Sequence, residues 1–342
     1  MSPIIRECNR LSLDYFILHT GQHYSYNMDK VFFEQLELPD AKYNLDVGSG
    51  SHAEQTGKML VQIEKILLDE KPQIVLVEGD TNTVLAGALA AYKLGIEVGH
   101  VEAGLRSYDR RMPEEINRVL TDHCSDYLFA PTEKARMILL GEGLPEEKIF
   151  VTGNTIVDAV YQNLEIAEKK KSVLESHGIN LGEYFLTTVH RQENVDDKGR
   201  FSSILEGLEL VSEYFNVPVV YPVHPRAKKM MKRHRLNPKI MLIDAVDFLT
   251  FLHLERYAKL ILTDSGGVQE EACIIGVPCV TLRDNTERPE SLEVGANVIA
   301  GVKPEEILRK AKTMLKTKRK WRNPFGEGRA AVKIVDVLMR LN

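Results

Sequence analysis

Short apolar runs alternate with longer amphipathic stretches along most of the chain. The apolar runs are rich in β-branched residues, as is typical of strands, and the stretches between them have the period of helices. The predicted strands are 15–20, 74–80, 97–103, 126–131, 148–153, 184–190, 217–224, 240–245, 260–267 and 277–283. This alternation indicates βαβ units and parallel sheets, and near-continuous apolar strands indicate sheets covered by helices on both faces.

The strand pattern is interrupted once, by a polar helical stretch at residues 160–178, and it resumes afterwards. A chain of 342 residues is long enough for two domains. We therefore predict an α/β protein with two doubly wound, Rossmann-like domains that face a central cleft and divide between residues 165 and 166. In such sheets, ligands bind beyond the carboxyl ends of the strands.

The start of the chain departs from this pattern. It opens with an amphipathic helical pattern in MSPIIRECNR (1–10), and the strand at 15–20 follows. A doubly wound domain normally opens with a strand and a tight loop before such a helix. The first βαβ unit therefore begins halfway through.

Composition and charge exclude several classes of protein. Hydrophobic residues make up 44% of the chain and the net charge is −5, which argues against a nucleic-acid-binding protein. The sequence shows neither a membrane-length apolar run nor a signal-peptide pattern, so we predict a cytoplasmic protein. The basic runs at 228–235 and 316–322 are interpreted as solvated helix faces. The four cysteines form no CxxC pair, and GxGxxG is absent, so we predict reduced thiols and neither a metal nor a redox cofactor.

Polar clusters follow successive predicted strands at the same end, where they would face one cleft. The clearest is DSGGVQEEA (264–272), in which a strand runs into Ser-Gly-Gly and a helix begins. Glycines let the backbone approach a ligand, and a helix start presents N–H groups that lack partners within the helix. Ser265, Gly266 and Gly267 therefore predict a phosphate site. Glu271 is placed to accept hydrogen bonds from ribose hydroxyls. The alternative is a plain turn with a serine N-cap.

Three further residues in this half of the chain are candidates. Arg288 in TERPE (286–290) carries the planar fork of donors that suits a phosphate. His190 and His224 each end a predicted strand and have an arginine next to or near them. A structural role is the alternative for either histidine.

In the first half, GHVEAGLRSYDRRMPEEINR (99–118) crowds carboxylates and arginines together. Glu102 ends a buried strand, where a carboxylate is costly unless it is paired or functional. Glu114 lies near the start of a predicted helix, one i,i+4 step from Arg118. A carboxylate held in this way stays ionised, which suits a base or a partner for a basic group.

Two alternatives remain open in this half. An ordinary surface ion pair would explain Glu115 and Arg111 equally well. Asp80 directly follows a strand in EGDTNT (78–83). It is either functional or a helix N-cap, a role that Asp80 or Thr81 would serve, and the two roles are compatible.

Taken in order, these motifs resemble one family, the non-hydrolysing UDP-N-acetylglucosamine (UDP-GlcNAc) 2-epimerases. The similarity covers essentially the whole chain. The matching motifs are GQH (21–23), GDT (79–81), HVEAGLR (100–106), PEEINR (113–118), GN (153–154), TVHRQEN (188–194), HPR (224–226), DSGGVQEEA (264–272), TERPE (286–290) and NPFGEG (323–328).

The resemblance implies a fold, a reaction and partners. It implies the GT-B fold with a last helix, 325–342, that returns to the N-terminal domain of residues 1–165, leaving 166–324 as the UDP-binding domain. It implies interconversion of UDP-GlcNAc and UDP-N-acetylmannosamine (UDP-ManNAc) by elimination of UDP to 2-acetamidoglucal and re-addition, without a metal or cofactor. A homodimer is implied as well.

The resemblance also implies roles for individual residues. Positions that hold UDP are matched by Ser265, Gly266, Gly267, Arg288, His190, Glu271 at the ribose and Phe251 beside the uracil. Positions needed for turnover are matched by Asp80, Glu102, Glu114 and Arg118. Our hypothesis is that Asp80 and Glu102 handle the protons while Glu114 and Arg118 orient the site.

The chain departs from the family at its start. Relatives begin with a strand and a GTRPE-type loop that faces the diphosphate, so we expect the natural protein to start upstream of Met1. Gln22 and His23 partly match a regulatory nucleotide-sugar site of bacterial relatives, whereas 49–58 does not. The rival interpretations are a hydrolysing epimerase that releases UDP and ManNAc, a GT-B glycosyltransferase, and a nucleotide-sugar-binding protein of low activity.

Overall fold

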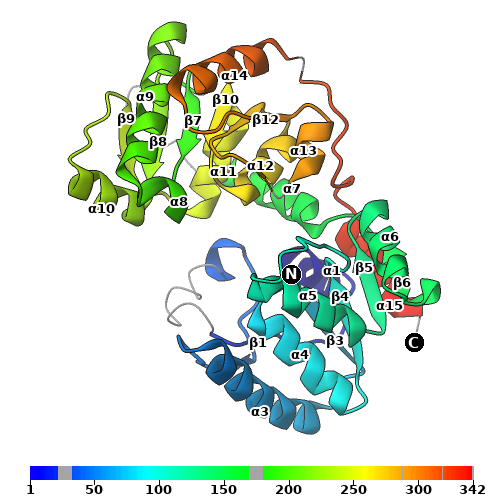
Figure 1. Ribbon diagram of the computed structural model, residues 1–342. Coiled ribbons are helices and arrows are strands. Elements are labelled where there is room, and N and C mark those ends of the chain that lie inside the picture. The colour runs from blue at the N-terminus through cyan, green and yellow to red at the C-terminus, as the bar shows by residue number, and fades with distance from the viewer. Residues whose placement is uncertain (22–32, 169–179, 287, 318, 341–342) are drawn as a thin grey trace. The chain divides into compact units, whose positions relative to one another are not determined.

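The structure, a computed structural model, describes residues 1–21, 33–168, 180–286, 288–317 and 319–340. The chain forms two compact units (Figure 1). Unit 1 comprises Met1–Ala159 and Phe325–Asn342, and unit 2 comprises Val160–Pro324. The division falls within helix α7 (Thr155–Ala167), and the predicted boundary lies further along the same helix.

Unit 2 contains a parallel sheet with the strand order β12-β11-β10-β7-β8-β9. Read from β9, this is the 3-2-1-4-5-6 order of a doubly wound nucleotide-binding sheet. The order reverses between β7 and β10, and that reversal marks the expected ligand position. The strands are β7 (Phe185–Thr188), β8 (Val219–Val223), β9 (Met241–Asp244), β10 (Leu260–Thr263), β11 (Cys279–Thr281) and β12 (Asn297–Ile299).

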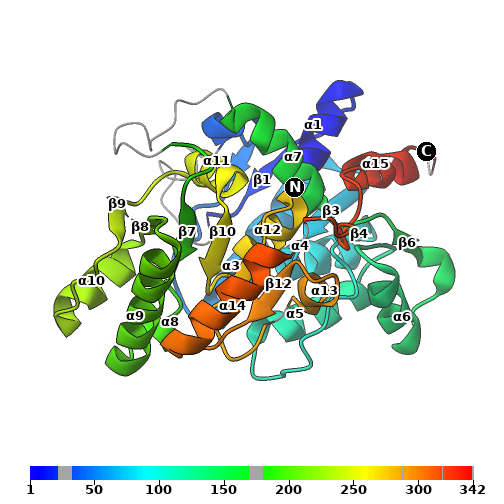
Figure 2. The same cartoon turned by 90° about the horizontal axis from the view of Figure 1, so that it is seen from above.

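Helices cover the apolar strands of unit 2 and bury its core. Helices α9 and α14 lie side by side against the sheet (Figure 2), so closely that a Cβ on Gly207 would come within 2.7 Å of Ile307. Among the largest fully buried side chains are Phe185, Phe201 and Tyr221. The helices are α8 (Gln192–Val195), α9 (Lys198–Phe215), α10 (Pro225–His234), α11 (Phe248–Tyr257), α12 (Gly266–Ile275), α13 (Pro289–Glu293) and α14 (Pro304–Lys316).

The strands of unit 1 form two separate parallel sheets. One pairs β1 (Leu18–His19) with β2 (Tyr43–Asn44), and the other has the order β3-β4-β5-β6. Within the described residues, no ladder joins the two. The strands of the larger sheet are β3 (Ile74–Glu78), β4 (Glu97–Val101), β5 (Tyr127–Ala130) and β6 (Ile149–Val151).

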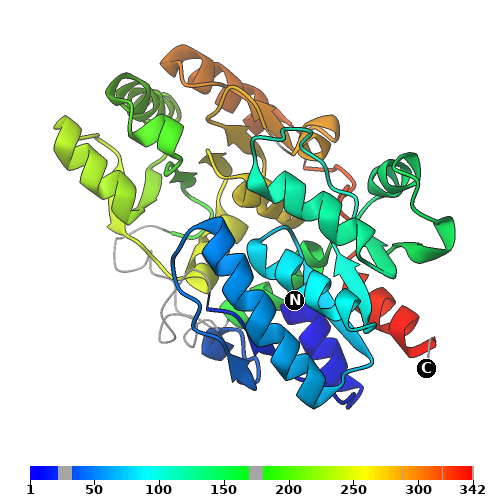
Figure 3. The ribbon, with the colours of Figure 1, turned by 60° about the horizontal axis from the view of Figure 1, so that its bottom comes forward.

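The last helix of the chain belongs to unit 1, where it packs beside the first helix (Figure 3). The carboxylate of Asp158 accepts hydrogen bonds from the N–H groups of Ala330 (3.1 Å) and Ala331 (3.0 Å), which stabilises the start of this helix. The helices of unit 1 are α1 (Ser2–Arg10), α3 (His52–Glu70), α4 (Asn82–Lys93), α5 (Pro113–His123), α6 (Glu133–Gly141), α15 (Ala330–Arg340), the first part of α7 and a 3₁₀ turn at Glu146–Lys148. No helix in the described part of the chain is long and apolar enough to cross a membrane.

Candidate active site

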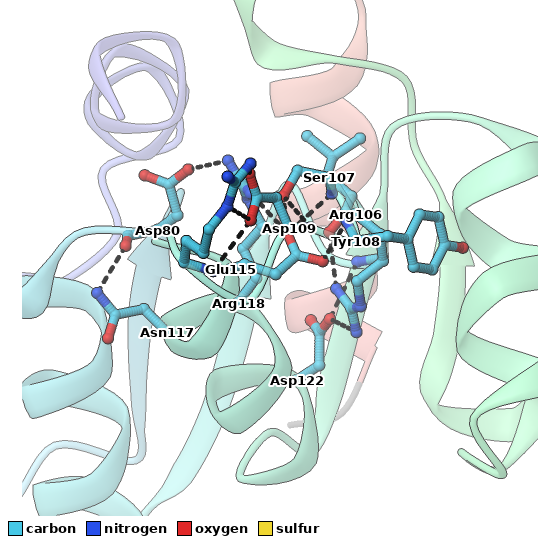
Figure 4. Close-up of polar contacts among 12 residues, drawn as sticks. Asp80, Arg106, Ser107, Tyr108, Asp109, Glu115, Asn117, Arg118 and Asp122 are labelled. Carbon is cyan, nitrogen blue, oxygen red and sulfur yellow. Dashed lines mark hydrogen bonds and ion pairs between the residues drawn. The ribbon is translucent and has the colours of Figure 1, made fainter. Parts of the chain in front are cut away.

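Asp80 lies in the turn between β3 and α4, and helix α5 holds this turn (Figure 4). The guanidinium of Arg118 donates to the carboxylate of Asp80, and the side chain of Asn117 donates to the Asp80 carbonyl oxygen at 2.9 Å. Gly79 makes the turn possible with a φ of +90°, which side chains rarely permit. The carboxylate is therefore oriented by a cation and its backbone is anchored to the same helix.

Glu115 is the second partner of Arg118, at 2.9 Å. It is only 5% exposed, and it also accepts hydrogen bonds from the N–H groups of Ser107 (2.8 Å) and Tyr108 (2.9 Å). Burial alone would raise the pKa of Glu115, but these hydrogen bonds outweigh burial and hold that pKa below its ordinary value. Glu115 therefore joins Arg118 to the loop that follows Glu102.

These contacts correct two predictions about α5. Arg118 pairs with Asp80 and Glu115, so the predicted ion pair between Arg118 and Glu114 is wrong. The surface-pair interpretation of Glu115 is also wrong, because Arg111 is exposed and bonds to Asp109 at 2.7 Å instead. The i,i+3 spacing puts Glu115 on the face of α5 that packs toward the loops. The role of Glu114 in turnover stays a prediction.

Glu102 follows β4 with a φ of +70°. This left-handed conformation is uncommon for residues other than glycine, and such strain often occurs at functional sites. Its strand is the neighbour of β3, and the N–H of Gly79 donates to the carbonyl of Val101 at 3.2 Å. The turns that carry Glu102 and Asp80 therefore begin side by side.

In unit 2, Asp264 organises the carboxyl ends of β7 and β10. It is fully buried and accepts hydrogen bonds from the backbone N–H groups of His190 (3.0 Å) and Arg191 (3.0 Å) and from the side chain of Asn194 (3.1 Å). The ring Nδ1 of His190 lies 3.4 Å from the same carboxylate. Because β7 and β10 flank the reversal in strand order, His190 stands at the expected ligand position.

Helix α12 starts at the same point, directly after β10. Ser265 is its N-cap, with Oγ accepting from the N–H of Val268 at 3.5 Å, so the capping role considered from the sequence is confirmed. Gly266 and Gly267 form the first turn, and a Cβ at Gly267 would meet no atom within 4 Å. The backbone is thus open to close approach at a helix start that favours anions.

The TERPE loop is attached to α12. Thr286 Oγ donates to Gln269 at 2.6 Å, and the Arg288 guanidinium lies 3.0 Å from the carboxylate of Glu270. The described residues of this loop therefore place Arg288 beside the first turns of α12. Its side chain is partly exposed, so it can also meet a ligand.

Two carboxyl groups are buried where α11 packs on α12. Burial, and then the neighbouring Glu271, raise the pKa of Glu255 well above its ordinary value. Burial also raises the pKa of Glu271 to about 7. Phe251 is half-buried one turn before Glu255 on α11. Glu271 can therefore exchange a proton near neutrality, and burial disfavours the ionised form of Glu255 as well.

His224 begins α10, and its ring lies 5.6 Å from that of His190. Burial lowers the pKa of His224. A cavity of about 710 Å³ adjoins it, lined by Asp196, His224, Pro225, Arg226, Lys229, Met230, Arg233 and His234. Gln22 and His23, predicted for a regulatory site, lie outside the described residues.

Sequence reasoning missed Glu115 and Asp264 as individual site residues. Both are buried carboxylates that accept backbone N–H groups, and only their positions inside PEEINR and DSGG could have singled them out. The four cysteines are thiols without disulfide partners. Among the residues with described positions, no cluster of three His, Cys, Asp or Glu side chains could hold a metal ion.

Two α/β units, one with an open glycine-rich helix start and one with oriented carboxylates at its strand ends, are consistent with an enzyme of the GT-B class of nucleotide-sugar proteins. Comparison with known proteins narrows this class. The family described as UDP-N-acetylglucosamine 2-epimerase matches residues 6–339, so the chain belongs to this family.

Relatives and solved structures agree with this assignment. The UDP-GlcNAc 2-epimerase of Methanocaldococcus jannaschii is 58% identical over 99% of this chain and 94% of its own length. Its crystal structure in complex with UDP-GlcNAc and UDP has a TM-score of 0.85 and covers 99% of this chain and 95% of that one. A 2-epimerase of Pseudomonas aeruginosa that is named for UDP-2,3-diacetamido-2,3-dideoxy-D-glucuronate is 44% identical. The match covers 96% of this chain and 92% of that relative.

Proposed function

We propose that this enzyme interconverts UDP-GlcNAc and UDP-ManNAc by elimination and re-addition of UDP. The observation that carries the proposal is that one chain holds oriented carboxylates in unit 1 and, in unit 2, a helix start whose N–H groups favour anions. This chain is 58% identical to a UDP-GlcNAc 2-epimerase. We further propose that both sets of residues act on one bound nucleotide sugar.

In this proposal, unit 2 holds UDP. The backbone at Gly266 and Gly267, together with Arg288, stabilises the negative charge on the diphosphate as it leaves. Ionised Glu271 accepts hydrogen bonds from the ribose hydroxyls, and Phe251 lies beside the uracil. Ser265 and His190 complete the set that surrounds the diphosphate.

The carboxylates of unit 1 act on C2 of the sugar. One removes the C2 proton while the bond between C1 and the UDP oxygen breaks, which leaves a C1–C2 double bond in 2-acetamidoglucal. UDP then attacks C1 again and C2 receives a proton on its opposite face. Asp80 and Glu102 handle these protons, Arg118 and Glu115 orient Asp80, and Glu114 is kept as a predicted contributor.

One specific observation favours a second candidate substrate. The relative from Pseudomonas aeruginosa, named for a diacetamido uronic acid, is 44% identical to this chain. The same C2 chemistry would serve such a sugar, because only the substituents at C3 and C5 differ. UDP-2,3-diacetamido-glucuronate is therefore the second candidate substrate.

Proton NMR of the reaction in D₂O tests the proposal. UDP-GlcNAc should give UDP-ManNAc, and both sugars should gain deuterium at C2. Free ManNAc with UDP would show a hydrolysing epimerase instead, and UDP binding without C2 exchange would show a binding protein. A parallel reaction with the diacetamido substrate compares kcat/KM for the two sugars.

Two further properties are proposed on the family resemblance alone. A homodimer is expected, and light scattering coupled to size-exclusion chromatography measures the mass of the protein in solution. A cytoplasmic location is expected, and fractionation of the producing cell tests it. Neither property enters the chemistry proposed above.

A further inference from the structure

A largely buried charged cluster lies next to the two turns that carry Asp80 and Glu102. It consists of His100 on β4, Asp122 on α5, Arg106 in the loop after β4, and Glu142 at the end of α6. His100 and Asp122 are both fully buried, and the Arg106 side chain is 1% exposed. Such a cluster is costly to bury unless its charges balance and its hydrogen bonds are satisfied.

His100 connects α5 to the Asp80 turn. Its Nδ1 lies 2.6 Å from Asp122 Oδ1, and its Nε2 lies 2.9 Å from the carbonyl oxygen of Gly79. Gly79 immediately precedes Asp80 in the chain. The ring therefore fixes the backbone from which the Asp80 carboxylate projects.

Asp122 connects the same ring to the Glu102 turn. Its second oxygen accepts from the N–H of Gly104 at 3.2 Å and from Arg106 at 2.7 Å (Figure 4). Gly104 has a φ of +81°, and a Cβ there would lie 2.5 Å from the carbonyl oxygen of Ala135. The loop after Glu102 thus lies in close contact with α6, and the Asp122 carboxylate accepts a hydrogen bond from its backbone.

The hydrogen bonds determine the protons on His100. A carbonyl oxygen can only accept, so Nε2 must carry a proton. Asp122 accepts from Gly104 and Arg106, as an ionised carboxylate does, so Nδ1 must carry a proton as well. The positive charges of His100 and Arg106 then balance the negative charges of Asp122 and Glu142, the latter bonded to Arg106 at 2.6 Å.

We propose that His100 is a buried imidazolium and a positioning residue that fixes the turns of Asp80 and Glu102 relative to each other. The inference rests on the proposed function, because that function assigns the two carboxylates to C2. In the proposed function UDP is held by residues of unit 2, whereas His100 belongs to unit 1. A variant that lacks the His100 hydrogen bonds should therefore have lower turnover and unchanged UDP binding.

The ring charge is measured by NMR of the intact chain labelled with ¹⁵N-histidine. In the folded chain, both ring nitrogens of His100 should carry protons, as their hydrogen bonds to Asp122 and to the Gly79 carbonyl require. The signal is assigned by its absence from His100→Gln. In Asp122→Asn, the new amide can donate to Nδ1 while its oxygen still accepts from Gly104 and Arg106, so the ring should become neutral. A neutral ring in the unmodified chain would overturn the charge assignment.

Kinetics test the positioning role. His100→Gln should lower kcat by about 10²-fold, the cost of misplacing catalytic groups by about 1 Å, while the UDP dissociation constant stays within about twofold. Glu133→Gln, at an exposed residue of α6 that bonds to Arg136 outside the cluster, is the control and should leave both unchanged. If His100→Gln does not fold, Asp122→Asn replaces it, with an expected fall in kcat of about tenfold because neutral hydrogen bonds hold the turns less firmly.

The outcomes separate this inference from the proposed function. Unchanged kcat in the folded variant, or an equal loss of UDP binding, would show that His100 is not a positioning residue. Absence of C2 exchange in the unmodified chain would instead reject the proposed function. The NMR experiment still decides the charge of His100 in that case.

Discussion

The two units build their candidate sites in different ways. Unit 2 uses a strand, a tight turn and a helix start, and its donors are backbone N–H groups close together in sequence. Unit 1 uses side chains from separate elements, with Arg118 joining Asp80 and Glu115. Backbone N–H groups can stabilise an anion and cannot exchange a proton at C2, whereas carboxylates can. The difference in construction therefore parallels the division between binding and chemistry in the proposed function.

The same contrast appears in the buried glutamates. Hydrogen bonds from Ser107, Tyr108 and Arg118 overcome burial and lower the pKa of Glu115 in unit 1. In unit 2, burial raises the pKa of Glu271 to about 7. One residue type thus supplies a fixed charge in one unit and a titrating group in the other.

The largest expected effect comes from removing a carboxylate in unit 1. Glu102→Gln should lower kcat and C2 deuterium exchange by about 10²- to 10⁴-fold, because the amide cannot transfer the proton. UDP affinity, measured by calorimetry, should not change. Glu133→Gln, an exposed glutamate that bonds to Arg136, is the control. Normal exchange in Glu102→Gln would show that unit 1 does not perform the chemistry as assigned.

Breaking the ion pairs of Arg118 should have the next largest effect. Arg118→Met leaves Asp80 and Glu115 without their shared cation, so we expect kcat to fall by about 10²-fold through misplacement of Asp80. Steady-state kinetics with UDP-GlcNAc measure it. Arg111→Met removes an arginine that is 90% exposed and should be neutral. Equal losses in both variants would mean that overall charge, and not orientation, matters.

The contrast between a local motif in unit 2 and dispersed side chains in unit 1 also explains which parts of the fold and site the sequence predicts. Strand-turn-helix sites are local in sequence, so the DSGG motif alone predicts the helix start of unit 2. Each predicted strand contains an observed one, whereas β2 and β12 were not predicted. The GT-B fold was predicted correctly through the family resemblance.

The contacts of unit 1 were not predictable in this way. The spacing of Glu114 and Arg118 satisfies the i,i+4 rule, yet the tertiary position of the Asp80 turn directs Arg118 to Asp80 and Glu115 instead. The left-handed conformation of Glu102 is likewise invisible in the sequence, because glutamate rarely adopts it. Side-chain networks between distant segments need the fold before they can be derived.

A smaller effect is expected from unit 2. Arg288→Met removes a charged donor from the proposed diphosphate site, so the UDP dissociation constant should rise by about 10- to 100-fold. Calorimetry with UDP measures it, and kcat at saturating substrate should change less than in Arg118→Met. Arg309→Met, at an exposed ion pair with Glu306, is the control. A larger effect on kcat than on UDP binding would contradict the division between the two units.

The smallest expected effect is a pH dependence of UDP binding. The pKa of Glu271 is raised to about 7, so in the unliganded chain its carboxyl ionises as pH rises through that value. If the ribose hydroxyls need the ionised form, UDP affinity should fall by about tenfold between a pH of about 8 and a pH of about 6. The stability of the unliganded chain should change with pH in the opposite direction to UDP affinity. In the unfolded chain Glu271 loses its proton at a lower pH than in the folded chain, so the free energy of unfolding decreases as pH rises from about 4.5 to about 7.

Glu271→Gln separates this effect from protonation of UDP itself. The variant should bind UDP more weakly at a pH of about 8, and any pH dependence that persists in it belongs to the terminal phosphate. Calorimetry at matched pH values measures both chains. A wild-type profile that parallels the variant's would mean that Glu271 does not titrate on binding. The contrast between a fixed charge in unit 1 and a titrating group in unit 2 would then have no effect on function.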